Sequence, residues 1–282
     1  MGERMAESFQ DRIGIDFGAR LPIEEAIAWS ARNAVRYIDV RLGDTGNVFA
    51  DFDQARLKAT RDAADRAGVH LGLHTLSAVN VAETAPFLRE AVDEYLERYI
   101  DLAGPLGARW IVMHAGYHFT GDYERRVETG IARLQRLGDY ALKRGVRLLL
   151  ENMNPEPADA EVRYLACDIP ETERFLSALD PAAIGWSFTA NHAHMLPVGV
   201  RGFFEHFGPA RMEEVRLADN RGGKEEHLKP GEGNLDFEDC FAAIEGAGYR
   251  GHYMLAYGTI EDMQQGREEL GARAVRAGIA AA

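Results

Sequence analysis

The sequence predicts a single (β/α)8 TIM barrel, and three observations support this fold class. Eight short apolar runs of strand length recur along the 282 residues, and an amphipathic helical stretch follows each run. The sharpest run, 147–153, delivers Glu151 and Asn152 at its C-terminal end, where a parallel barrel collects its functional side chains. No Pro- or Ser-rich linker divides the chain, so we expect one domain over residues 1–282 with a tail at 1–10.

The expected strands follow one another at intervals that leave room for one helix each. We identify them as apolar runs rich in β-branched and aromatic residues, bounded by glycine or polar residues. Their expected ranges are 12–18, 37–42, 70–76, 109–116, 147–153, 184–190, 214–219 and 252–258.

The stretches between the strands carry the start and stop signals of helices. Asp168 is an expected N-cap, with a proline in the first turn and Glu171 three residues later, and Asp236 is a second expected N-cap. Glycines mark expected helix ends near Gly68, 104–107, Gly145 and 246–248. One expected buried helix face consists of Phe87, Ala91, Val92, Tyr95, Leu96, Tyr99 and Ile100.

Composition and charge restrict the class of function. The 32 Lys and Arg against 45 Asp and Glu give a net charge of −13, and no clustered basic tract is present, which disfavours nucleic acid as a partner. No apolar run is long enough to cross a membrane, and residues 1–5 lack the apolar core of a signal peptide. Cys167 and Cys240 are far apart in sequence and are expected to be free thiols. We expect a cytoplasmic protein with a small-molecule partner, and a homo-oligomer stays open.

Polar residues at the expected strand ends form a candidate site. All strand C-termini of a parallel barrel open onto one face, so these side chains should converge there. A single histidine in such a place is more often a structural hydrogen-bonding residue, but several on one rim favour a functional site. The candidates are Asp16, Asp39, Arg41, His74, His114, Glu151, Asn152, His192, Arg216, Asp219 and His227.

Two loops add detail to this site. In 227–233, a histidine precedes a Gly-x-Gly turn that would let backbone approach a ligand, although a flexible hairpin between strand and helix explains the turn equally well. His192 and His194 form a His-x-His pair that suggests a metal. Only one of the two can face the site if the backbone there is extended.

Several of these segments together resemble the xylose-isomerase-like TIM barrel superfamily, which includes sugar phosphate isomerases and epimerases and the family 2 apurinic endonucleases. The resemblance runs from the first strand to the last helix. The segments that carry it are 114–116 (His-Ala-Gly), 150–152 (Leu-Glu-Asn), 190–193, 217–220, 227–233 and 248–251.

The resemblance also implies a metal site that this chain lacks in its usual form. The epimerases of the superfamily hold one divalent metal with four ligands, of which only Glu151 is kept. The other three positions carry Thr189, Arg216 and Ala256. A guanidinium has no lone pair for a metal, so we expect no metal at this position, with Arg216 as a fixed positive charge that pairs with Glu151 in fork geometry. A degenerate pseudoenzyme is the alternative.

The endonuclease pattern implies a different possibility. Its further metal ligands match two sets of residues that this chain keeps, and His2Glu is a known zinc set. A divalent metal displaced to His74, His114 and Glu151 is therefore the alternative cofactor prediction. The two sets are His74, His114 and Glu151, and His192, Glu225 and His227.

From the resemblance and the residues we expect an enzyme that acts on a small polyol or keto-sugar by proton transfer next to a carbonyl, as an isomerase, epimerase or dehydrating lyase. Glu151 would be the base, and Arg216 would stabilise the enolate. His114, His192 and His227 would bind hydroxyls or carry the second proton, and Arg41 could bind an anionic group. A non-catalytic ligand-binding or partner-subunit barrel and a metal-dependent nucleic-acid phosphodiesterase are the rival functions. The expected substrate-binding residues are Arg41, His74, Asn152, Trp186, Asp219 and His227.

Overall fold

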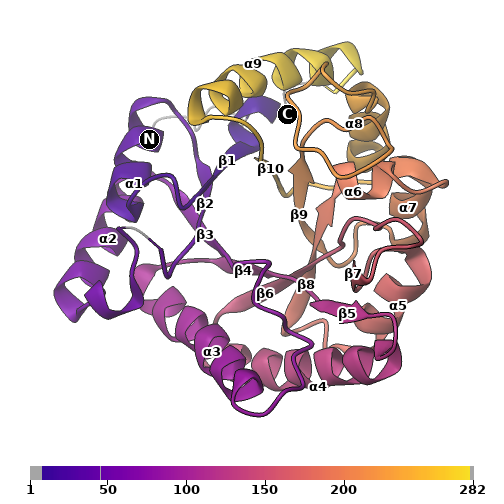
Figure 1. Ribbon diagram of the computed structural model, residues 1–282. Helices are drawn as coiled ribbons and strands as arrows, with labels where there is room; N and C mark the ends of the chain where they lie inside the picture. The colour runs from indigo at the N-terminus through magenta and orange to yellow at the C-terminus, as the bar shows by residue number, and fades with distance from the viewer. Residues whose placement is uncertain (1–7, 45, 280–282) are drawn as a thin grey trace.

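A computed structural model describes residues 8–44 and 46–279, and its strands close into a parallel barrel (Figure 1). The barrel order is β1-β10-β9-β8-β6-β4-β3-β2, and every neighbouring pair in it is parallel. This confirms the predicted fold class. The barrel strands are β1 (Ile13–Gly18), β2 (Tyr37–Val40), β3 (His70–His74), β4 (Trp110–Met113), β6 (Arg147–Glu151), β8 (Ile184–Thr189), β9 (Met212–Leu217) and β10 (His252–Leu255).

Helices surround the barrel as an outer layer (Figure 1). Asp168 and Asp236 accept hydrogen bonds from the backbone N–H groups of Glu171 and Asp239, as their predicted N-cap roles require. The helices are α1 (Ile23–Arg32), α2 (Gln54–Ala67), α3 (Leu88–Leu106), α4 (Tyr123–Leu142), α5 (Ile169–Ala178), α6 (Ala190–His194), α7 (Gly199–Phe207), α8 (Phe237–Gly246) and α9 (Ile260–Arg276), with 3-10 turns η1 (Phe9–Arg12) and η2 (Phe49–Asp51).

Alternation along the strands separates two apolar clusters. In β6, Leu148 and Leu150 belong to the large core between barrel and helices, whereas Leu149 belongs to a small cluster with Trp110 and Met254. Side chains alternate between the two faces of a strand, so the small cluster lies in the barrel interior. Polar residues share this interior, among them the Glu214–His252 pair and, at the C-terminal ends of the strands, Glu151 and Arg216.

Several predicted boundaries differ from the structure. The strands end earlier than expected, for example at Met113 instead of residue 116, because the last residues of each run turn into the loops that form the barrel mouth. Phe87 is 88% exposed with a φ of 68°, so the buried face of α3 begins later than its apolar pattern suggests. A small antiparallel sheet of β5 (Tyr117–Phe119) and β7 (Val162–Tyr164) was not predicted, because three-residue strands leave too short a pattern.

The expected tail is only partly a tail. Residues 1–7 lie outside the described residues. Phe9, however, is buried against Phe241 and Tyr253, with ring centroids 5.0 Å apart in both contacts. η1 therefore packs against the barrel instead of trailing from it.

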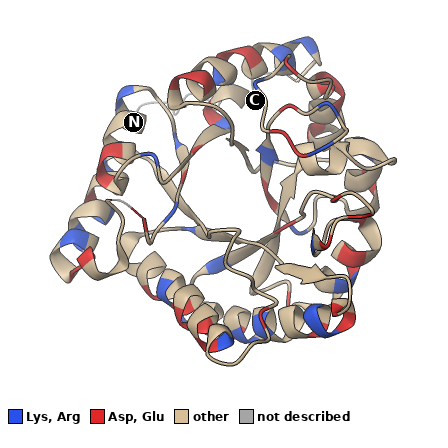
Figure 2. Cartoon of the chain, in the orientation of Figure 1, with Lys and Arg blue, Asp and Glu red and all other residues tan. Residues whose placement is uncertain are grey.

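The surface carries both signs of charge. Figure 2 shows Lys and Arg interspersed with Asp and Glu along the helices that surround the barrel. No described helix is long and apolar enough to span a membrane.

Candidate active site

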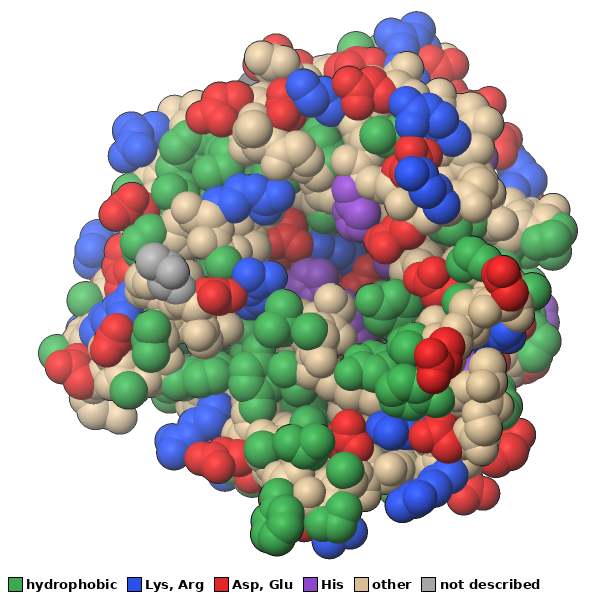
Figure 3. Space-filling view, in the orientation of Figure 1, with side chains coloured by type: hydrophobic (Ala, Val, Ile, Leu, Met, Phe, Trp, Pro, Cys, Tyr) green, Lys and Arg blue, Asp and Glu red, His purple; other side chains and the backbone are tan. Residues whose placement is uncertain are grey.

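A cavity of about 270 Å³ opens at the C-terminal end of the barrel. Figure 3 shows the hollow with histidine and charged side chains at its floor. Of the ten residues predicted to have a catalytic or substrate-binding role, seven line this cavity: Arg41, His74, His114, Glu151, His192, Arg216 and His227; the strand-end candidate Asp16 lines it too. Asn152, Asp219 and Trp186 do not.

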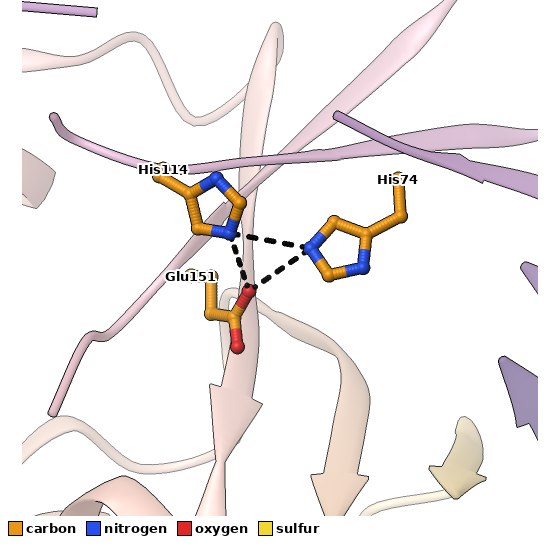
Figure 4. A group of neighbouring side chains, drawn as sticks. All are labelled: His74, His114 and Glu151. Atoms are coloured by element: carbon orange, nitrogen blue, oxygen red, sulfur yellow. Dashed lines mark hydrogen bonds and ion pairs between the residues drawn. The ribbon is translucent and has the colours of Figure 1, made fainter. Parts of the chain in front are cut away.

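The centre of the cavity is a triangle of ligand-type atoms from β3, β6 and the loop after β4 (Figure 4). His74 Nε2 lies 3.2 Å from His114 Nε2, and these atoms lie 3.3 and 3.2 Å from Glu151 Oε2. Ligands about 2.0–2.1 Å from a tetrahedral zinc ion lie about 3.3 Å apart, so the triangle has the dimensions of one face of such a site.

The hydrogen bonds around the triangle leave its inner atoms short of protons. His74 Nδ1 lies 3.0 Å from Asp16 Oδ2, which makes Nδ1 the donor and leaves a lone pair on Nε2 when the ring is neutral. Glu151 Oε2 is buried and has no hydrogen-bond partner among the described residues. Three acceptor atoms facing one another need either extra protons or a cation between them, so these residues fit a divalent metal.

The pKa shifts of the three residues, without a bound metal, agree with a requirement for extra positive charge among them. Burial and Arg216 oppose a charged His74, but its hydrogen bond with Asp16 and its close contact with Glu151 raise the pKa of His74 to about 9. Burial would raise the pKa of Glu151, yet its contacts with His114 and His74 and the charge of Arg216 hold it well below the ordinary value. Burial lowers the pKa of His114. One proton on His74 thus takes the place that a cation would fill.

A second group of the same composition lies on the other side of the cavity. Glu225 Oε1 is 3.1 Å from His192 Nε2 and 2.7 Å from His227 Nε2. The Nδ1 atoms of the two rings lie 2.8 Å from the carbonyl of Asn152 and 2.6 Å from that of Ala256. A carbonyl can only accept, so both Nδ1 atoms carry hydrogen and both Nε2 atoms face the carboxylate. This group also suits a cation.

Arg216 lies beneath both groups, and its partners differ from the prediction. Its Nη1 donates to Asp39 Oδ2 at 2.6 Å and to Glu214 Oε1 at 3.0 Å, and its Nη2 donates to Asp16 Oδ2. Only the Nε atom approaches Glu151, at 3.8 Å from Oε1. The expected fork pairing with Glu151 is therefore wrong, because three other carboxylates take the terminal nitrogens.

The partners of Arg216 are held in turn by other inward-facing side chains. Asp39 Oδ1 accepts from Trp110 Nε1 at 2.9 Å, and Glu214 Oε1 accepts from the Ser187 hydroxyl at 2.9 Å. Gly72 provides the room, because a Cβ there would lie 2.2 Å from both Trp110 and Asp39. Burial and the neighbouring Glu214 raise the pKa of Asp39 to about 8, so this carboxyl retains a proton near neutral pH.

The residues present do not fit a metal at the position that the sequence resemblance implies. The Thr189 hydroxyl donates to Glu151 Oε1 at 2.5 Å, Arg216 supplies a fixed cation, and the side chain of Ala256 supplies no ligand atom.

The three predicted residues outside the cavity have structural contacts. The Asn152 side chain binds the backbone N–H and carbonyl of Thr189, and Asp219 accepts from the backbone N–H groups of Gly231, Gly233 and Leu235. Trp186 is 1% exposed and packs on Phe188 and Phe207, because its position in β8 faces the helices.

The two loops that the sequence analysis described differ in how they contribute to the cavity. In 227–233, the turn is anchored by Asp219 and carries His227 to the cavity. The His-x-His pair lies in the short helix α6 instead of an extended segment, and His194 Nε2 contacts Asn234 Oδ1 at 2.6 Å. His192 alone reaches the cavity.

One acidic and one basic side chain beside the site were not predicted from the sequence. Glu214 and His252 lie inside the barrel, with Glu214 Oε2 3.0 Å from His252 Nε2. Glu214 precedes Arg216 by two residues and therefore lies on the same face of β9. This two-residue spacing is the feature of the sequence that predicts an inward-facing Glu214.

The fold and the site define the class of this protein as a TIM barrel with two histidine–carboxylate groups at the mouth of the barrel. Comparison with known protein families then identifies its family. Residues 27–276 match the family model described as xylose isomerase-like TIM barrel, so the chain belongs to this family. It is 26% identical over 234 residues to L-ribulose 3-epimerase of Methylomonas sp. (strain DH-1), covering 80% of this chain and 75% of that protein.

Two further comparisons agree with this membership. An uncharacterized protein, y4fM, of Sinorhizobium fredii is 26% identical over 235 residues, covering 73% of this chain and 72% of that protein. The crystal structure of a D-tagatose 3-epimerase-like protein superimposes with a TM-score of 0.80 at 20% identity, covering 95% of this chain and 98% of that one. At this identity the structural match shows the shared fold.

We predict that Arg216→Ala destabilises the fold by about 3–5 kcal/mol, because it leaves buried carboxylates without a partner. Arg216→Lys keeps the charge but cannot reach three carboxylates at once, so its loss should be smaller. Urea unfolding of the three proteins measures both effects. A loss below about 1 kcal/mol for Arg216→Ala would show that these carboxylates do not depend on the guanidinium.

We further predict that Zn²⁺ or Mn²⁺ binds with release of about one proton at neutral pH, because His74, with a pKa of about 9, must lose its proton before Nε2 can bind. Affinity should therefore rise about tenfold per pH unit from neutral pH up to this pKa. Calorimetric titration in buffers of different protonation enthalpy counts the proton.

His74→Gln should remove this binding event, whereas His206→Gln, on the exposed surface of α7, should leave it unchanged. Metal uptake that His74→Gln does not alter would place the ion elsewhere.

Proposed function

We propose that the protein is an isomerase or epimerase, or a related dehydrating lyase, that acts on a small polyhydroxylated carbonyl compound by proton transfer at the carbon next to the carbonyl. The observation that carries this proposal is the convergence of Glu151, His74, His114 and His192 in one cavity of about 270 Å³. A cavity of this size suits a small molecule. The family and the L-ribulose 3-epimerase relative support a sugar-like substrate.

Glu151 is the proposed base. Its lowered pKa keeps the carboxylate ionised at neutral pH, and the Thr189 hydroxyl fixes its Oε1 atom. A carboxylate held in one orientation can accept a proton from a bound substrate without reorganising. The same low pKa makes Glu151 a weak base, so substrate binding or a cation near the carbonyl must make the carbon acid stronger.

His74, His114 and Glu151 are proposed to hold a divalent cation, which is the displaced site that the sequence left as the alternative. When bound, such a cation would polarise the substrate carbonyl and stabilise negative charge on its oxygen. Asp16 orients His74 through the 3.0 Å contact with Nδ1. We keep the prediction that no metal binds at the position beside Thr189, Arg216 and Ala256.

His192 is the proposed carrier of the second proton. Its Nδ1 donates to the Asn152 carbonyl, and its Nε2 faces Glu225 at 3.1 Å, so Nε2 is the ring atom that can pass a proton to or from a bound substrate. His227 shares Glu225 and can bind substrate hydroxyls at the cavity edge.

The role that we propose for Arg216 differs from the one that the sequence suggested. The sequence suggested direct stabilisation of an enolate, but three carboxylates occupy its terminal nitrogens. We propose that Arg216 is a positioning residue whose charge keeps Asp16 and Glu151 ionised beneath the substrate.

Metal-dependent phosphodiester hydrolysis is a second candidate function, because both histidine–carboxylate groups that the endonuclease pattern implies are assembled here. The net charge of −13 and the mixed surface of Figure 2 argue against a nucleic-acid backbone as the substrate. Cleavage of an abasic-site duplex by the metal-loaded protein would favour this candidate over the proposed one.

We predict that Glu151→Gln reduces proton exchange at the substrate carbon by about 10²- to 10⁴-fold, because the amide cannot accept a proton. Deuterium incorporation from D₂O into a panel of ketopentoses and ketohexoses, followed by NMR, measures this step directly. Glu173→Gln, on exposed α5, is the matched control and should exchange at the wild-type rate. Equal exchange by wild type and Glu151→Gln would remove Glu151 from the base role.

A further inference from the structure

The cavity is asymmetric in charge around its rim. Apart from the buried Arg216, the Lys or Arg residues that line it are Arg20 and Arg41, which follow the adjacent strands β1 and β2. The lining also includes Glu225 and His227. In Figure 3, Lys and Arg side chains edge the hollow on the side of β1 and β2.

Arg20 is exposed, and backbone carbonyls hold its guanidinium. Nη1 donates to the carbonyls of Asp16 at 3.2 Å and Phe17 at 3.3 Å, and Nη2 donates to the carbonyl of Gly258 at 3.0 Å. No carboxylate of the described residues forms an ion pair with it within 4.0 Å. The guanidinium is therefore fixed over the mouth by the loops after the first and last strands, with its charge not offset by a described acidic neighbour.

Arg41 is joined to the same part of the rim. Its backbone N–H donates to the carbonyl of Gly18 at 2.9 Å, and this links the two loops. Its side chain forms a half-exposed pair with Asp44 at 2.8 Å. An exposed pair of this kind contributes about 0–1 kcal/mol, so a bound anion can redirect Arg41 at little cost.

We infer that the substrate of the proposed reaction carries an anionic group, a carboxylate or a phosphate monoester, which Arg20 binds with the help of Arg41. This inference rests on the proposed function and adds the substrate class to it. Guanidinium groups bind such oxyanions through paired N–H donors.

The remaining charges set the direction in which such a substrate binds. At the floor, Asp16 and Glu151 are paired with Arg216, and the proposed cation among His74, His114 and Glu151 takes the substrate carbonyl. Arg20 at the rim, by contrast, has no described carboxylate within 4.0 Å and is open to an anion. The anionic end therefore stays at the rim beside β1 and β2, and the carbonyl end reaches Glu151 and the two histidines of the triangle.

The test compares a neutral ligand with its charged counterparts. D-fructose, D-fructose 6-phosphate and D-fructuronate, with inorganic phosphate as a fourth probe, are titrated calorimetrically into the full-length wild type and the Arg20→Gln and Arg41→Gln variants. Wild type should bind a charged probe about 10- to 100-fold more tightly than fructose, and Arg20→Gln should remove this preference without weakening fructose. The phosphate and carboxylate arms show which anion is selected.

Arg250→Gln is the control, because Arg250 is also exposed with its guanidinium on backbone carbonyls, in the loop before β10 at the other end of the barrel, although unlike Arg20 it also pairs with Glu245 at 3.5 Å. It should keep the wild-type preference. Deuterium exchange on the same compounds separates the two proposals. Charge-selective, Arg20-dependent binding without exchange would support the inference and contradict the proposed function. Exchange with equal affinity for neutral and charged probes, or no Arg20-dependent binding of any anion, would overturn the inference.

Discussion

One guanidinium surrounded by carboxylates is the constraint on which this site depends. Arg216 is 2% exposed and contacts Asp16, Asp39 and Glu214, with Glu151 nearby. Four buried carboxyl groups cannot all be ionised around one permanent cation without a cost of several kcal/mol for each unpaired charge. The remaining charge must be balanced by protons or by a further cation.

This balance links the barrel interior to the chemistry at its mouth. A proton retained by Asp39 and a proton on His74 provide the balance when no metal is bound. A divalent ion among His74, His114 and Glu151 would replace the His74 proton and add one more positive charge. On the proposed function, the fixed cation of Arg216 opposes an ion at the position beside Thr189, while the histidines about Glu151 Oε2 offer another. Thr189, Arg216 and Ala256 together lack the ligand atoms of the usual position, and the proposed ion lies among His74, His114 and Glu151 instead.

The sequence predicted the barrel and most of its mouth because strand alternation and strand-end position are local signals. Glu151, His74 and His114 were found in this way. The partners of Arg216 were not, because Asp16 and Asp39 are 200 and 177 residues away in sequence and meet it only when the barrel closes. The predicted contact of Arg216 with Glu151 is present through Nε at 3.8 Å, but its predicted fork geometry was wrong for this reason.

Other errors came from strand face and local conformation. In β8, Ser187 and Thr189 face the interior, so Trp186 must face the helices, and this alternation was available in the sequence. The helical turn at 190–194 was not, since an extended segment fits the same residues. Arg20 does not stand at a predicted strand end. Its position at the cavity depends on the contact between the loops after β1 and β10, which are far apart in the sequence.

The most direct test of the central claim is the position of a bound ion in crystals grown with Mn²⁺ or Zn²⁺, located by anomalous scattering. The structure predicts an anomalous peak about 2.0–2.3 Å from His74 Nε2, His114 Nε2 and Glu151 Oε2, with Arg216 still on its three carboxylates. A peak beside Thr189 with Arg216 displaced would contradict the claim that arginine has taken the usual metal position.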